Sequence, residues 1–215
     1  AKYMPTDNDV IRLDFIMDEG YNIGYAALPM DVLFAKAKLY AITYQHYPSQ
    51  TWFEKLETKV YANTVNHSMD DTKRPDVIMH MDMPGWTKTF GGYVDARFGL
   101  KKHSMTARLD GYHTNARAEM TMYPNNEAPM FMLTWPDVDK LDFGLYLQDD
   151  IQFNAKRKLS FNARLEYLNT EVIDQFGVQQ AAVFNQDVSE IDHRLLKNAS
   201  LTYMEMFGKG LSGWM

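Results

Sequence analysis

Methionine and histidine side chains gather in one segment of the chain, between residues 66 and 92. The candidate ligands in this segment are His67, Met69, Met79, His80, Met81 and Met83. Thioether sulfur and imidazole nitrogen suit Cu(I) and tolerate Cu(II), whereas ferric iron prefers hard oxygen donors. Side chains two positions apart in an extended chain point the same way. His67 and Met69 can therefore converge on one ion, and we predict a copper site here.

Other methionines and histidines have weaker claims to metal binding. The next long loop expected along the chain, after His113, contains Met120, Met122, Met130 and Met132. Loop methionines commonly serve as flexible packing, and that is the default interpretation of each one outside the predicted pair. His103 and Met105 repeat the two-residue spacing, but they begin a strand beside the turn at Lys101–Lys102, at the opposite end of the predicted strands.

Sequence motifs of enzymes are absent. The chain contains no GxSxG, no HExxH and no phosphate-binding glycine loop, so we expect neither catalysis nor a catalytic cofactor. The net charge of −6 argues against a nucleic-acid partner, which would normally face a basic stripe. With no cysteine in the chain, neither disulfides nor thiolate metal sites can form within it.

Strict alternation of apolar and polar residues predicts the elements that position these side chains. It is clearest in residues 89–98, 106–112, 141–148 and 159–167. In one of these segments, for example, Phe143 and Leu145 alternate with Asp142 and Gly144. A two-residue repeat puts every second side chain on the same face of a strand, whereas a helix would repeat every 3.6 residues. The fold class is therefore all-β.

The predicted connections alternate between short and long. Short turns are expected at about residues 45–50, 100–102, 154–158 and 207–210, and long connections at about residues 18–31, 63–86, 114–138 and 169–192. The result is about nine strands of about 10–14 residues, long enough to cross a bilayer at a tilt. Short turns on one side and long loops on the other are typical of outer-membrane barrels. We predict that residues 1–215 form part of an antiparallel transmembrane β-barrel, with long external loops and short periplasmic turns.

The two faces of the predicted sheet differ in chemistry. The apolar face would contact lipid, and the polar face would line a lumen with a structural network of Asp95, Arg97, Arg108, Asp110, Arg164 and Glu166. Aromatic residues near strand ends, such as Trp52 and Trp86, fit the girdles at membrane boundaries. The mean hydropathy of −0.41 is compatible with an alternating barrel. A soluble β-sandwich remains the alternative fold, because its strands also alternate.

One hairpin resembles a hairpin shared by TonB-dependent receptors. Its sequence is DFGLYLQDDIQFNAKRKLSFNARLEY, in which a YxQDxI pattern precedes a short turn and a strand similar to xNxGxRY. The matching residues are Tyr146, Gln148, Asp149, Ile151, Asn162, Arg164 and Tyr167. The resemblance implies a barrel of about 22 strands in the outer membrane of a Gram-negative bacterium, with TonB acting on an N-terminal plug. The chain would be a barrel fragment without that plug.

Two further strings resemble the copper-receptor branch of this family. They are NHSMDDTKRP and MHMDMPGWTKTFGG, and a His-x-Met motif before an aspartate falls on His67, Met69 and Asp70. The resemblance implies that His67 and Met69 bind copper as the transported ligand. In that branch a cysteine and a methionine of the plug complete the site, so this cysteine-free chain could not complete it alone.

Three other functions stay open. A siderophore or haem receptor of the same family would contact an organic metal chelate with its loops. A passive porin would have the same architecture without plug or TonB, and a soluble β-sandwich binding protein would belong to another class. Within the receptor family, a companion lipoprotein that caps the barrel could be a further partner.

Overall fold

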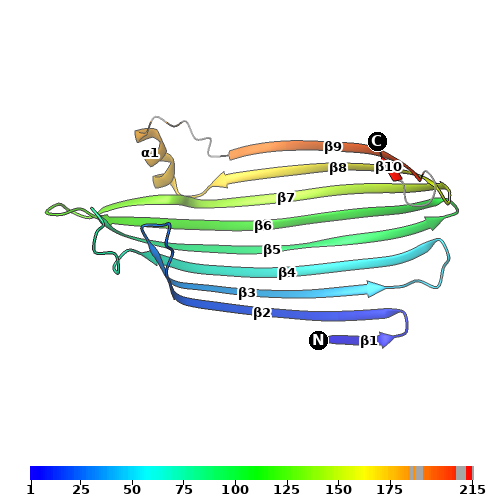
Figure 1. Cartoon of the computed structure of the whole chain (residues 1–215), viewed down its shortest axis with the longest axis horizontal. Coiled ribbons are helices and arrows are strands. Elements are labelled where there is room, and N and C mark those ends of the chain that lie inside the picture. Colours follow the sequence, from blue (N-terminus) through cyan, green and yellow to red (C-terminus); the bar gives the residue numbers. More distant parts are fainter. Residues whose placement is uncertain (185, 187–190, 207–211, 215) are drawn as a thin grey trace.

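In the described part of the chain, ten strands form one antiparallel sheet, and strands adjacent in the chain are adjacent in the sheet (Figure 1). This computed structural model describes residues 1–184, 186, 191–206 and 212–214. The strands are β1 (Lys2–Thr6), β2 (Asp9–Ile23), β3 (Asp31–His46), β4 (Phe53–Asp70), β5 (His80–Leu100), β6 (His103–Tyr123), β7 (Met130–Asn154), β8 (Arg157–Val172), β9 (Ile191–Met206) and β10 (Ser212–Trp214). The helix α1 (Gln175–Val183) lies between β8 and β9. No helix of the described residues is long and apolar enough to span a membrane.

Connections of different length lie at opposite ends of the sheet (Figure 1). The loop end carries residues 24–30, 71–79 and 124–129 together with α1. The turn end carries the turns at residues 7–8, 47–52, 101–102 and 155–156. The turn expected at residues 207–210 lies outside the described residues. In the described part of the chain, three of the four turns have two residues each, whereas the turn at 47–52 has six, as many as the loop at 124–129. The predicted alternation of short turns with longer connections is therefore present except at that turn.

Strand lengths correct the prediction. β4 runs to Asp70 and β5 starts at His80, so their connection is residues 71–79 and not 63–86. The shortest of the strands β2–β9 has 15 residues and the longest has 25, against the expected 10–14. The sequence did not predict these strand ends, because each strand stays hydrogen-bonded to its neighbouring strands beyond the point where its apolar–polar alternation stops. A turn at residues 7–8 also divides the first expected strand into β1 and β2, which gives ten strands instead of nine.

The sheet is one curved layer (Figure 1). All ten strands belong to one sheet in chain order, and within the described residues no second sheet packs against it. A β-sandwich needs two stacked sheets, so the sandwich alternative does not describe these residues. The described strands also do not close into a cylinder, because no pairing joins β10 to β1.

One face of the sheet exposes large apolar side chains; it is called the apolar face. Phe15, Phe90, Leu109 and Phe143 on it are 52–61% exposed. Alternate residues of the same strands carry the charged and amide side chains, and they define the polar face. The predicted segregation of chemistry is therefore present. Few apolar side chains are buried in this single layer; those that are buried are Val10, Met30, Val32, Ala41, Ala116 and Leu133.

A break in the pairing of β6 with β7 lies near the loop end. Ala116 pairs with Val138, whereas Glu119 pairs with Leu133. β7 thus holds two more residues than β6 across this stretch, and Asp137 adopts a positive φ of 51° within it. The helix α1 docks beside this break, where the side-chain amide of Gln180 both donates to and accepts from the backbone of Leu133 at 2.9 Å.

Candidate functional site

Methionines from four strands meet in register near the loop end. Met69 of β4 lies opposite Met83 of β5. Met81 of β5 lies opposite Met122 of β6, which lies opposite Met130 of β7. Directly opposed residues in an antiparallel pair have Cβ atoms about 4.5–5.5 Å apart. Long thioether side chains at these positions are therefore neighbours.

Met120 of β6 extends the row that begins with the Met69–Met83 pair. It pairs with Met132 of β7, and the uninterrupted register between β5 and β6 puts it opposite Met83. One row across the sheet therefore contains Met69, Met83, Met120 and Met132, and the neighbouring row contains Met81, Met122 and Met130. We call these seven residues the methionine ladder.

The methionine ladder lies on the polar face. Met83 and Asp95 are separated by twelve positions of β5, an even number, and the pairing of β5 has no bulge between them. Side chains an even number of positions apart on a strand share a face. The ladder therefore lies above the ion pairs of the polar face, toward the loop end.

His67 belongs to the same face and sits beside the ladder. His67 of β4 pairs with Gly85 of β5, two residues along each strand from the Met69–Met83 pair. Its ring rests on Gly85, since a Cβ at that glycine would lie 2.7 Å from the Cε1 atom of His67. Neither ring nitrogen has a hydrogen-bond partner among the described residues. Both nitrogens can therefore bind an external ligand.

Met79 and His80 are placed apart from this cluster. Met79 lies in the loop, and His80 occupies the position before Met81, so its side chain points to the opposite face. The Nδ1 atom of His80 lies 3.0 Å from Oδ1 of Asp71, and Oδ2 of the same buried carboxylate accepts a hydrogen bond from the backbone of Met81. This carboxylate fixes the start of β5.

An ion pair ties the loop between β4 and β5 to the start of β3. Arg74 donates from Nε to Oδ2 of Asp31 at 3.1 Å and from Nη2 to the carbonyl of Tyr25 at 2.7 Å. The hydrogen bond from Arg74 lowers the pKa of Asp31. Since Asp31 pairs with Asp70 at the end of β4, the ion pair holds the loop close to the methionine ladder.

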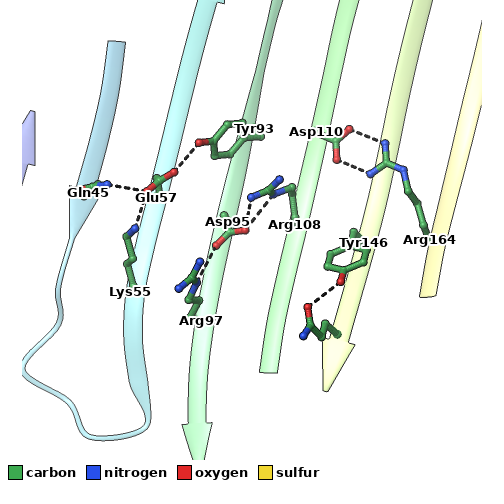
Figure 2. Close-up of polar contacts among 11 residues, drawn as sticks. Gln45, Lys55, Glu57, Tyr93, Asp95, Arg97, Arg108, Asp110, Tyr146 and Arg164 are labelled. Carbon is green, nitrogen blue, oxygen red and sulfur yellow. Dashed lines mark hydrogen bonds and ion pairs between the residues drawn. The ribbon is translucent and has the colours of Figure 1, made fainter. Parts of the chain in front are cut away.

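The six charged residues predicted as a network form two clusters on the polar face, and Figure 2 shows five of them, all except Glu166. Asp95 is buried and accepts from Arg108 at 2.9–3.0 Å, while Arg97 lies 3.6 Å away. Arg164 binds both oxygens of Asp110, at 2.8 and 2.9 Å, and also Glu166 at 2.8 Å. Such two-pronged, charge-assisted hydrogen bonds are strong and fix geometry. The Asp95–Arg108 pair joins the adjacent strands β5 and β6, and Arg164 of β8 reaches across Gly144 of β7 to Asp110 of β6.

Sequence reasoning missed other members of the polar face. Glu57 accepts from Lys55, Gln45 and Tyr93 at 2.6–2.7 Å (Figure 2). Asp142 is 2% exposed, and its Oδ1 atom has no hydrogen-bond partner among the described residues. Glu57 belongs to no motif and to none of the clearly alternating segments. The alternation had placed Asp142 on the polar side of its strand, but nothing in the sequence indicated that it is buried.

The donor chemistry of the site is dominated by sulfur. Among the described residues, no group of three or more His, Cys, Asp or Glu side chains is placed to hold a metal ion. His67 and the methionine ladder instead offer one imidazole and seven thioethers on a single surface. This donor set suits Cu(I) better than ferric iron, which prefers oxygen.

No protein-family model and no curated protein matches the sequence. Among solved structures, the chain is similar to the copper transporter OprC, with a TM-score of 0.81 and 17% sequence identity. The similarity covers 97% of this chain and 33% of that one. The chain therefore has the fold of about a third of that transporter and spans only that share of its length.

Proposed function

We propose that this chain is part of the barrel of a TonB-dependent outer-membrane receptor that imports copper. The observation that carries the proposal is the convergence of His67 and the methionine ladder on the polar face at the loop end. Weak thioether ligands in series suit an ion that must be captured and then released inward. No catalytic role is proposed.

The dimensions of the apolar face support a membrane position. Its aromatic residues include Trp86 near the loop end and a stack of Trp52, Phe53 and Phe98 at the turn end, with ring centroids 5.2–6.0 Å apart. Twelve positions of β5 separate Trp86 from Phe98, which is about 40 Å along the strand. A tilt of about 40° reduces this to about 30 Å of depth, close to the thickness of a bilayer core.

In this proposal the polar face lines the barrel lumen. An N-terminal plug, outside this chain, would occupy that lumen and connect the receptor to TonB. The fold shared with the copper transporter OprC supports the architecture. The loop end would be external, so an incoming ion would meet the methionine ladder before it reached the Asp95 and Asp110 ion pairs.

Copper binding can be tested on the full-length receptor. We expect the double variant His67→Ala with Met69→Ala to lose the stoichiometric Cu(I) that the wild-type protein binds under reducing conditions. Metal analysis and titration with a competing Cu(I) chelator measure this loss. An unchanged copper stoichiometry in the double variant would reject copper and leave the sheet assignment standing.

The chain offers a matched control for this experiment. His103 and Met105 have the same residue types and spacing, but they lie on the apolar face at the turn end, and His103 is bound to Asp149 at 2.7 Å. The variant His103→Ala with Met105→Ala should keep its copper. A siderophore or haem receptor would instead bind its organic chelate equally well in both double variants.

A further inference from the structure

Three lysines interrupt the apolar face close to the loop end. Lys38 of β3 and Lys88 of β5 flank Thr64 of β4 in one row across the sheet, and Lys36 lies two positions nearer the loop end on β3. An even number of positions separates Lys88 from Phe90 and Val94, so the lysines share the face of those apolar side chains. This row marks where the apolar band ends.

Two of the lysines have no counter-ion in the described part of the protein. Lys38 and Lys88 are exposed and form no ion pair there. Lys36 is half-buried, with its ammonium over the rings of Tyr21 and Phe34 at 5.3 and 5.5 Å, and it lies across from Glu19. Together they leave an excess of positive charge on a surface that faces lipid in the proposed receptor.

The lysines line a groove of about 270 Å³ between β3 and β5. Its other walls are formed by Thr64, Asn66 and Trp86. The side-chain oxygen of Asn66 is buried and has no hydrogen-bond partner among the described residues. The groove therefore combines cationic groups with polar and aromatic walls.

A second, separately lined hollow lies on the same face, nearer its middle. Its volume is about 420 Å³, and its walls include Phe90, Val94, Leu109 and Phe143. Its floor is the cross-strand pair Gly92 and Gly111, which has no side chains. Four positions of β5, about 14 Å, separate Lys88 from Gly92. The lysines near the loop end and the apolar hollow nearer the middle of the sheet follow the order of groups in a lipid, whose acyl chain extends from its polar headgroup toward the middle of the bilayer.

We propose that these two features bind one phosphorylated lipid of the outer leaflet, with its phosphate on Lys36, Lys38 and Lys88 and an acyl chain in the glycine-floored hollow. This inference rests on the proposed membrane position of the sheet. A lysine facing lipid is costly near the middle of the bilayer and tolerated at its boundary, where an anionic phosphate neutralises it. Lysine binds phosphate as a point charge.

The test uses the full-length receptor in nonionic detergent with purified lipid A as the probe. Native mass spectrometry counts the lipid retained by the wild type and by the variant Lys36→Gln, Lys38→Gln, Lys88→Gln. We expect lipid A to bind at least about tenfold more weakly to this variant, because three attractive charges are lost. Lysine-to-arginine changes at the same positions should restore binding. The single variant Lys88→Gln, which should lose part of the binding, serves if the triple variant does not fold.

Control variants distinguish a specific lipid site from nonspecific attraction of lipid A to surface lysines. The variant Lys101→Gln, Lys102→Gln, Lys156→Gln at the turn end should bind lipid A as the wild type does. The inference would be overturned if both triple variants retained the same amount of lipid A. It would also be overturned if the wild type retained dephosphorylated lipid A as well as it retains lipid A, or if equimolar inorganic phosphate displaced lipid A. Copper stoichiometry is measured on the same samples. If copper is retained while lipid selectivity is absent, only the lipid site fails, whereas a receptor that stays soluble without detergent removes both proposals.

Discussion

At the scale of single residues, Gly85 decides whether His67 can reach the methionine ladder. The ring of His67 lies against this glycine, where any Cβ would come within 2.7 Å of it. The two-residue spacing of His67 and Met69 predicted that both share a face, and they do. The same rule excludes His80 from the methionine ladder. His80 directly precedes Met81, and consecutive residues of a strand point to opposite faces.

We expect Gly85→Ala to weaken Cu(I) binding by about tenfold or more, the usual effect of disturbing a group that orients a metal ligand. The added methyl group pushes the ring of His67 aside, and the flexible side chain yields before the backbone does. A competition titration with a Cu(I) chelator measures the change. Gly24→Ala is the control, since its Cβ would lie 3.6 Å from Asp31, an ordinary contact. Equal Cu(I) affinities of Gly85→Ala and Gly24→Ala would contradict this role of Gly85.

At the scale of elements, strand pairing creates the site. Met120, Met122, Met130 and Met132 were interpreted by default as loop packing because they fall where a loop is predicted. The structure extends β6 and β7 through them, and pairing then aligns them with Met81 and Met83. Periodicity predicted which segments are strands and which of their side chains share a face. Register and strand ends could not be predicted, because they depend on hydrogen bonds to segments distant in sequence.

The Asp31–Arg74 ion pair predicts how pH affects the loop between β4 and β5. The pKa of Asp31 is lowered in the folded protein, so the ion pair stabilises the loop at pH values above the ordinary aspartate pKa. That contribution is lost as the pH falls through the folded-state pKa. We expect Asp31→Asn to speed backbone hydrogen exchange of residues 71–79 at neutral pH. If exchange in that segment is the same in the variant and the wild type at neutral pH, the ion pair does not hold the loop.

At the scale of the whole molecule, a single layer with two unlike faces needs a different environment on each side. Leu145 is 44% exposed on the apolar face, and its neighbours along β7 are equally apolar. The alternation visible in the sequence predicted this asymmetry. It did not separate one curved layer from two stacked ones, because the sequence pattern of both is the same.

We expect Leu145→Arg to destabilise the full-length receptor in lipid vesicles by about 2–4 kcal/mol, the cost of an arginine on a lipid-facing strand near the bilayer middle. Urea unfolding followed by tryptophan fluorescence measures the loss. Gln148→Arg on the polar face, beside Asp150, should change stability by less than about 1 kcal/mol. Similar losses in both variants would show that the apolar face does not contact lipid.

The two additional residues of β7 opposite Ala116–Glu119 have a consequence for how this chain can vary in length. Because their number is even, Met130 and Met132 emerge beyond the break on the same side as Met120 and Met122. A single deletion there would turn both sulfur atoms outward while leaving every hydrogen-bonded strand in place. Related chains that keep the cluster should therefore gain or lose residues in this stretch by twos.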